Sequence, residues 1–258
     1  MKIFAKSKYY LLFSVLPIVI IFGGLKVGVH LLGWEVIPKE MTSFFPSILT
    51  GIIFLLGFLL AGVVTDYKES EKIPNELAAS LYTLWHEVEY VKHVSNSKYA
   101  ENLKSKIKNF IPTLKRDYFV LRNDNLEKLL DSFSSDIIDM GKEGVPPNYI
   151  VRMKSEITTL KKTINRISII KSTDFVPSVF ISINTIAVIF LIVYCLLSVE
   201  PWWVGVVLVS IFTFIIFSIL FLIKDMDDPF EYDESDDVKS DEVSLEVLDN
   251  LQKEFKDK

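Results

Sequence analysis

The sequence predicts an all-α membrane protein with four transmembrane helices and a helical domain outside the bilayer. Three observations lead to this fold class. Of the 258 residues, 50% are hydrophobic and 24% are charged, yet the charges largely avoid four long apolar stretches. Each stretch has about 20 residues or more, the length at which a helix crosses a hydrocarbon layer ~30 Å thick. Elsewhere hydrophobic residues recur at helical spacing, without a useful length of strand-like alternation.

The four apolar stretches are residues 9–32, 44–64, 175–199 and 202–223. The first has the position of a secretory signal, but no small-residue cleavage site follows its apolar run. Residues 23–26 lead instead into further apolar chain. We therefore expect all four stretches to be retained, as in a multi-pass membrane protein.

Basic residues near the ends of these stretches predict the orientation. Lys2, Lys6 and Lys8 precede the first stretch, many basic residues follow the second, and Lys224 follows the fourth, whereas the loop at 199–202 has none. Lysine and arginine near spans favour the cytoplasmic side. We expect both termini and the middle segment in the cytoplasm, and the protein in the inner or plasma membrane of the cell.

The stretches divide the chain into four parts. Residues 1–65 form a first transmembrane helix pair, 66–174 a cytoplasmic helical domain, 175–224 a second helix pair, and 225–258 an acidic tail with an amphipathic helix. The middle part is predicted to be helical because its apolar residues recur at spacings of three and four. It is expected to break at residues 95–97, 123–124 and 141–147, where Asn, Ser, Gly and Pro gather.

The tail changes character along its length. From Asp225 onward it carries fourteen acidic residues and four lysines, and its first half is too polar to pack alone. Ser244 is then placed to cap a helix with Leu245, Leu248, Leu251 and Phe255 on one face. We expect this face to cover the cytoplasmic helices of the same or a neighbouring chain.

Several functional classes are disfavoured. Near-balanced charge in residues 66–174 argues against a nucleic-acid surface, which needs a clustered basic excess. The single cysteine, Cys195, excludes a disulfide framework within the chain. His86 and His93 lie seven residues apart, without the four-residue spacing of a zinc-binding pair. We expect no enzyme, and we interpret the apolar stretches as free of intramembrane charge, which argues against a cation pathway.

The second apolar stretch carries the candidate site. Thr50, Phe54, Phe58 and Gly62 follow one another at intervals of four, and so form a slowly drifting stripe on a helix. The stripe is compatible with contact to lipid or to a neighbouring helix. It is also compatible with rings of Phe54 and Phe58 around an axis shared by several copies, which would form a hydrophobic neck. Aromatic ring edges carry positive charge and would tolerate anions better than cations.

Two motifs can be compared with those of known membrane proteins. The run from Phe54 to Phe58, followed by Val63-Val64-Thr65 and a charged stretch ending at Pro74, resembles the pore-lining second span of the bestrophins. The acidic Asp-Pro-Phe segment that starts at Asp228, followed by a short amphipathic helix, resembles their segment after the last span. The order of the four spans and the long helical insert agree, so the chain is similar to a distant bestrophin-like member.

This resemblance implies a function. It implies a pentameric anion channel whose second spans form the neck, with Thr50, Phe54 and Phe58 at the three neck positions. It also makes Asp233 and Asp236 candidate calcium ligands, since similar acidic residues help to hold calcium in animal members. The sequence departs from the family at residues 66–68, where Asp-Tyr-Lys replaces Arg-Trp-Trp.

The leading hypothesis is a homo-oligomeric, pentameric channel for chloride or other small anions, with Thr50 supplying a hydroxyl donor near the outer mouth. Its partners are the lipid bilayer, the permeant anion and further copies of itself. The alternative is a non-conducting membrane scaffold or signalling protein that acts through its cytoplasmic helices, with Phe54 and Phe58 as packing residues.

Overall fold

The computed structural model describes residues 10–95, 97–116, 125–172, 177–227, 229–230 and 243–257. Within these residues the regular secondary structure is helical, with one isolated bridge between Ile37 and Leu197. Four of the described helices are long and apolar enough to cross a membrane. The predicted all-α class with four transmembrane helices is confirmed.

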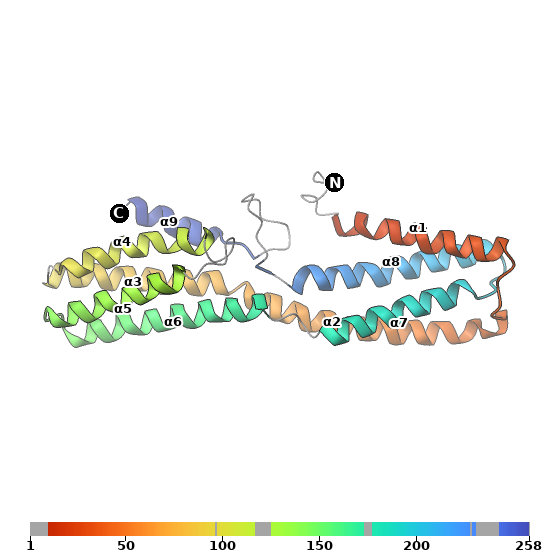
Figure 1. Ribbon diagram of the computed structural model, residues 1–258, viewed down its shortest axis with the longest axis horizontal. Coiled ribbons are helices and arrows are strands. Elements are labelled where there is room, and N and C mark those ends of the chain that lie inside the picture. The colour runs from red at the N-terminus through yellow and green to blue at the C-terminus, as the bar shows by residue number, and fades with distance from the viewer. Residues whose placement is uncertain are drawn as a thin grey trace. The chain divides into compact units, whose positions relative to one another are not determined.

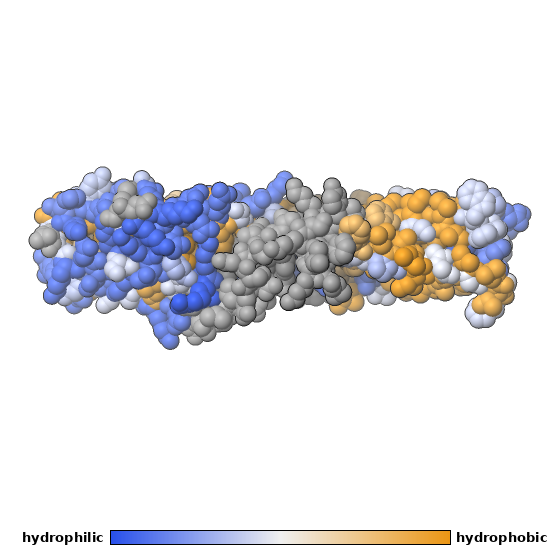
Figure 2. Space-filling view, turned by 90° about the horizontal axis from the view of Figure 1, so that it is seen from above, coloured by the Kyte–Doolittle hydropathy of each residue, from blue (hydrophilic) through white to orange (hydrophobic). Residues whose placement is uncertain are grey.

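The chain divides into two compact units, which we call the membrane unit and the helical unit (Figure 1). The membrane unit comprises Met1–Tyr67, Asp174–Asp228 and Lys239–Asp241, and the helical unit comprises Lys68–Thr173, Pro229–Val238 and Glu242–Lys258. On the face that Figure 2 shows, the surface of the membrane unit is largely hydrophobic and that of the helical unit is largely hydrophilic.

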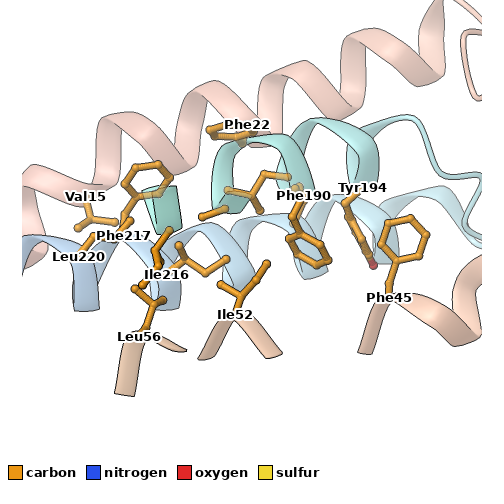
Figure 3. Packing of buried hydrophobic residues seen from close by; sticks show 14 of the residues in the cluster. Val15, Phe22, Phe45, Ile52, Leu56, Phe190, Tyr194, Ile216, Phe217 and Leu220 are labelled. Atoms are coloured by element: carbon orange, nitrogen blue, oxygen red, sulfur yellow. The ribbon is translucent and has the colours of Figure 1, made fainter. Parts of the chain in front are cut away.

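The membrane unit contains α1 (Tyr10–Leu31), most of α2 (Phe45–Ser70), α7 (Pro177–Cys195) and α8 (Trp202–Asp227). Helix α1 packs along α8, and α7 packs against both. Their apolar side chains meet in one cluster, part of which is drawn in Figure 3. Its labelled members are Val15, Phe22, Phe45, Ile52, Leu56, Phe190, Tyr194, Ile216, Phe217 and Leu220.

Two short connections meet at one end of the membrane unit, which we call the connection end. One connection, residues 32–44, links α1 to α2 and includes the 3₁₀-helix η1 (Lys39–Phe44); the other, residues 196–201, links α7 to α8. The Ile37 amide donates to the Leu196 carbonyl at 3.1 Å, and the Ser198 amide donates to the Ile37 carbonyl at 2.9 Å. These two bonds tie the connections together.

The helical unit contains α3 (Ile73–Ser95), α4 (Lys98–Thr113), α5 (Asn125–Lys142), α6 (Pro147–Ser172) and α9 (Glu246–Asp257). Each of α3, α4, α5 and α6 packs against two or more other helices, so their apolar faces form a shared core. The predicted breaks near residues 96 and 144 are confirmed: Ser97 caps α4 through the Tyr99 amide, and Gly144 adopts a positive φ after α5. The expected break at 123–124 lies outside the described residues.

Helix α9 covers α3 and α4, as its amphipathic pattern predicts. All four residues of its predicted apolar face are buried: Leu245, Leu248, Leu251 and Phe255. The Ser244 hydroxyl accepts a hydrogen bond from the Glu246 amide at the start of the helix. Lys115, which follows α4, forms an ion pair with Asp249 of α9. The C-terminal helix therefore belongs to the helical unit of its own chain.

A candidate pore-lining face on α2

Helix α2 contacts the rest of the membrane unit through one side only. The buried residues on this side are Phe45, Ile52, Leu56, Leu59 and Val63, all members of the shared apolar cluster. At the start of α2, the Phe45 ring meets Tyr194 edge-on, with centroids 5.3 Å apart. Within the part of the chain that the structure describes, the opposite side of α2 is exposed over most of its length.

The predicted stripe lies on that opposite side. Thr50 is exposed, and the Phe54 and Phe58 side chains are 72% and 76% exposed. Gly62 is only partly buried and lies toward the edge of the face, because a spacing of four drifts by about 40° per step on an α-helix. The structure thus brings Thr50, Phe54 and Phe58 onto one free face.

The same face carries small and hydroxyl residues that the four-residue spacing did not predict. These additional exposed residues are Ser47, Gly51, Gly57, Ala61 and Thr65. A side chain built at Gly51 or Gly57 would meet no atom within 4 Å. A search at the true helical period of 3.6 residues would have found Ala61 and Thr65, since they continue the face where Gly62 drifts away. The two phenylalanine side chains therefore project from a surface whose other side chains are small.

The two threonine hydroxyl groups on this face are bound to their own helix. The Thr50 hydroxyl donates to the Pro46 carbonyl at 2.8 Å, and the Thr65 hydroxyl donates to the Ala61 carbonyl at 2.8 Å. Threonines in membrane helices commonly make such bonds to the preceding turn. An anion at Thr50 would therefore have to compete with the Pro46 carbonyl for the hydroxyl proton.

The free faces of α1 and α8 have a different composition. Helix α1 exposes mainly large apolar residues, including Leu16, Ile20 and Ile21. Helix α8 exposes Val207, Ile211, Phe214 and Ile215. These side chains suit contact with lipid tails, whereas small residues are typical of surfaces where membrane helices approach one another closely. The α2 face is therefore distinguishable from the apolar faces beside it.

The interpretation of the spans as free of intramembrane charge is wrong for one residue. Lys26 lies within α1 and its side chain is fully buried. Its ammonium is 2.7 Å from a carboxylate oxygen of Glu35, which lies beyond the end of the helix. The sequence next to Lys26 is apolar and does not indicate a partner. Glu35 reaches Lys26 only because the chain reverses after α1. Between Phe45 and Thr65, α2 itself carries no charged residue.

The other candidate ligands do not come together as a metal site within the described residues. His86 is half-buried, its Nδ1 atom 3.5 Å from Glu89, while His93 is exposed. Among the described residues, no group of three or more His, Cys, Asp or Glu side chains is placed to hold a metal ion. The candidate calcium ligands Asp233 and Asp236 lie outside the described residues.

Comparison with known proteins identifies the fold. No family model and no curated protein matches the sequence. Three crystal structures of a bacterial bestrophin homologue from Klebsiella pneumoniae match the structure closely. One, with a tyrosine-to-alanine mutation, has a TM-score of 0.73 at 12% identity over 96% of this chain and 97% of that chain.

The other two structures agree with the first. One carries a leucine-to-threonine mutation and matches with a TM-score of 0.76 at 11% identity, over 95% of this chain and 98% of that chain. The structure obtained by zinc-based phasing has a TM-score of 0.75 at 12% identity, over 97% and 98% of the two chains. The likeness covers nearly all of both chains, so this protein is a four-span membrane protein with the bestrophin fold. The predicted resemblance is confirmed at the level of the fold.

Proposed function

We propose that this protein is a homo-oligomeric, pentameric anion channel whose α2 helices surround a shared axis. Phe54 and Phe58 form the neck, with Thr50 toward the outer mouth and Gly62 toward the inner end. Chloride or another small anion is the permeant ion. The protein spans the cell membrane with both termini in the cytoplasm, and Asp233 and Asp236 are the candidate calcium ligands of its tail.

One observation carries this proposal: α2 exposes two phenylalanines on a face that otherwise holds small and hydroxyl residues. A face of this kind allows several helices to approach one axis, while the phenylalanine rings narrow the path between them. A narrow apolar constriction can gate by excluding water. The bestrophin fold supports the same arrangement, because the bestrophins, which this chain resembles, build their neck from the second span.

Anions are the better substrate for two reasons. The membrane part of α2 has no acidic residue from Phe45 to Thr65, whereas cation channels commonly place carboxylate rings at their constrictions. Aromatic edges that point toward the axis present the positive part of the ring quadrupole to a passing ion. Both features favour an anion over a cation of similar size.

The alternative is a non-conducting scaffold that acts through the helical unit. It is supported by exposed apolar residues on α3, where Tyr82, Tyr90 and Val94 project from the surface at intervals of eight and four. In a scaffold, Phe54 and Phe58 would only pack against neighbouring helices or lipid, and their removal would lower stability without a change in permeation.

The deciding experiment measures chloride and potassium flux in liposomes that contain the purified protein. The variant is Phe54→Ala/Phe58→Ala, and the matched control is Ile20→Ala/Ile21→Ala on α1, where two apolar side chains are also exposed. We expect chloride-selective flux from the wild type and about tenfold more from the phenylalanine variant, the change that results when a barrier falls by ~1.4 kcal/mol. The control should conduct like the wild type.

The other outcomes are equally informative. All three proteins must first elute as the same oligomer from a sizing column in mild detergent. A monomer would contradict the channel, because one α2 helix cannot surround an axis. Equal changes in both variants would assign the phenylalanines to lipid contact. An intact oligomer with no flux from any of the three proteins would favour the scaffold.

A further inference from the structure

Lys26 of α1 is held by three acceptors inside the membrane unit. A lysine ammonium has three hydrogen atoms to donate. Here it donates to Glu35 Oε1 at 2.7 Å, to the Leu197 carbonyl at 2.5 Å and to the Cys195 carbonyl at 3.3 Å. Its side chain is fully buried, and these three groups are the acceptors that the described residues offer its ammonium.

The acceptors belong to parts of the chain that are distant in sequence. Glu35 lies in the connection that follows α1, whereas Cys195 and Leu197 lie at the end of α7 and in the connection to α8. Lys26 therefore joins both connections to the body of α1. We call Lys26, Glu35 and the two carbonyl groups the Lys26 latch.

The chain reversal after α1 places Glu35 in this site. Gly33 has a φ of +67°, its amide donates to the His30 carbonyl, and the Trp34 amide donates to the Val29 carbonyl. This pair of bonds is a Schellman motif, and glycine suits its left-handed residue because it has no Cβ atom. The motif returns the chain along α1, so Glu35 meets both Lys26 and His30.

Glu35 is the single carboxylate that the described residues place against the Lys26 ammonium. His30 Nδ1 is 3.4 Å from its second oxygen, and the His30 ring stacks on Trp202 of α8 with centroids 5.2 Å apart. Other titratable groups at this corner are the Cys195 thiol at the end of α7, the Lys39–Glu200 ion pair between the connections and the exposed Glu40 carboxylate. That ion pair is solvent-exposed and does not contact Lys26.

We propose that the Lys26 latch is an acid-sensitive clasp that holds the two connections together and keeps Cys195 covered. While Glu35 is ionised, its charge neutralises the buried ammonium. When Glu35 takes up a proton, the buried ammonium loses its counter-charge and keeps only neutral acceptors. A buried charge without its partner is strongly unfavourable, so the connections separate and water enters.

The direction of the pH effect follows from the surroundings of Glu35. Burial alone would raise its pKa, but the hydrogen bonds and charges of Lys26 and His30 outweigh this and hold the pKa below its ordinary value. A carboxyl group with a lowered pKa stabilises the folded state above its unfolded pKa, and this stabilisation is lost as the pH falls through the folded pKa. The latch is therefore closed at neutral pH and opens in acid.

The proposal does not require conduction. If α2 lines a pore, the latch also positions its entrance, because residues 32–44 lead directly into Phe45. If the protein is a scaffold, the latch still acts within the membrane unit. The test therefore reads the site itself and not the flux.

Cys195 provides the reporter, since it is the only cysteine in the chain and is buried beside the latch. The full-length protein in detergent is treated with a pyridyl disulfide, which reacts with thiols at acidic as well as neutral pH. The modification rate is divided by the rate for protein unfolded in strong detergent at the same pH. The proteins compared are wild type, E35Q, the double variant K26M/E35Q, and E200Q as a control that removes the exposed carboxylate of the other connection.

We expect slow modification of wild type at neutral pH and faster modification in acid. E35Q should react about tenfold faster or more at neutral pH, because its latch opens locally without protonation. K26M/E35Q should be protected again at every pH, because methionine fills the site without a charge. E200Q should behave like the wild type.

Three results would overturn the proposal. The first is a wild-type thiol that reacts at neutral pH as fast as in the unfolded protein. The second is an E35Q variant as protected as wild type. The third is a K26M/E35Q variant as reactive as E35Q, which would show that loss of the glutamate, and not the unpaired ammonium, opens the site. If E35Q fails to fold, a folded, protected and pH-independent K26M/E35Q variant supports the proposal, and a double variant that also fails to fold contradicts it.

Discussion

The Trp85 indole of α3 lies almost parallel to the Phe255 ring of α9, with ring centroids 4.4 Å apart and an interplanar angle of 15°. The Lys104 ammonium lies 4.3 Å from the Trp85 centroid and also forms an ion pair with Glu89. Both aromatic side chains are fully buried. Helix α9 thus completes the core of the helical unit, which explains why one face of α9 is apolar.

Replacement of Phe255 by alanine should release α9. Phenylalanine-to-alanine changes in protein cores lower the free energy of unfolding by about 3–5 kcal/mol. We expect a loss of this size to detach α9, which has only 12 residues. Thermal unfolding should begin at a lower temperature, and the Trp85 emission should shift to longer wavelength, measured as the difference from a Trp85→Phe background. Val247→Ala, at an exposed position on the same helix, is the control and should change neither signal. Unchanged emission in the Phe255 variant would contradict this docking.

Arg152 should matter for stability in spite of its exposure. It donates to Glu87 Oε1 at 2.7 Å, while Glu87 is buried and its Oε2 atom has no partner among the described residues. Arg152→Met leaves this carboxylate alone, and a buried acceptor without a partner costs about 1–3 kcal/mol. Chemical unfolding of the variant should show this loss, and Glu87→Gln added to Arg152→Met should recover most of it. A double variant as unstable as Arg152→Met would assign the effect to lost packing.

Gly205→Ala should disturb the connection end. A Cβ atom at Gly205 would lie 2.8 Å from Lys26 Cε and 3.2 Å from Val199 Cβ. The lysine stem cannot yield easily because three hydrogen bonds hold its ammonium. The unfolding temperature should therefore fall by several degrees, at about 2–4 °C per kcal/mol for a chain of this size. Gly24→Ala is the matched control, since its added methyl group meets no atom within 4 Å, and it should be neutral or slightly stabilising.

The stability contributed by Glu35 should depend on pH. Because its pKa is lowered in the folded state, the unfolding temperature of the wild type should exceed that of Glu35→Gln at neutral pH. The difference should shrink as the pH falls below the ordinary range of a glutamate and vanish below the lowered pKa. Glu40→Gln, at an exposed position in the same connection, should show no such trend. A difference that is constant across pH would mean that Glu35 acts through its shape and not its charge.

The sequence predicted the architecture because the signals involved are local. Length and hydropathy predict four spans, helical spacing predicts the helical unit, and the apolar face of residues 245–255 predicts a docked C-terminal helix. The stripe of Thr50, Phe54 and Phe58 was predicted for the same reason: a helix places residues four apart on one side whatever surrounds it.

The remaining features depend on which segments pack together. That the Phe54 side of α2 is the free one follows from the packing of the opposite side, led by Ile52 and Leu56, into the membrane unit. Lys26 was misread because its neighbours in sequence are apolar and its acceptors lie at positions 35, 195 and 197.

The sequence by itself therefore determined the four spans, the helical unit and the apolar face of each amphipathic helix. These features follow from the length and the spacing of apolar residues within a single segment. Only the tertiary structure decided which charge is buried, which face is free and where Phe255 docks. These outcomes depend on atoms brought together across long stretches of chain, and the free energy of a buried ammonium or a stacked ring is set by those atoms and not by its neighbours in sequence.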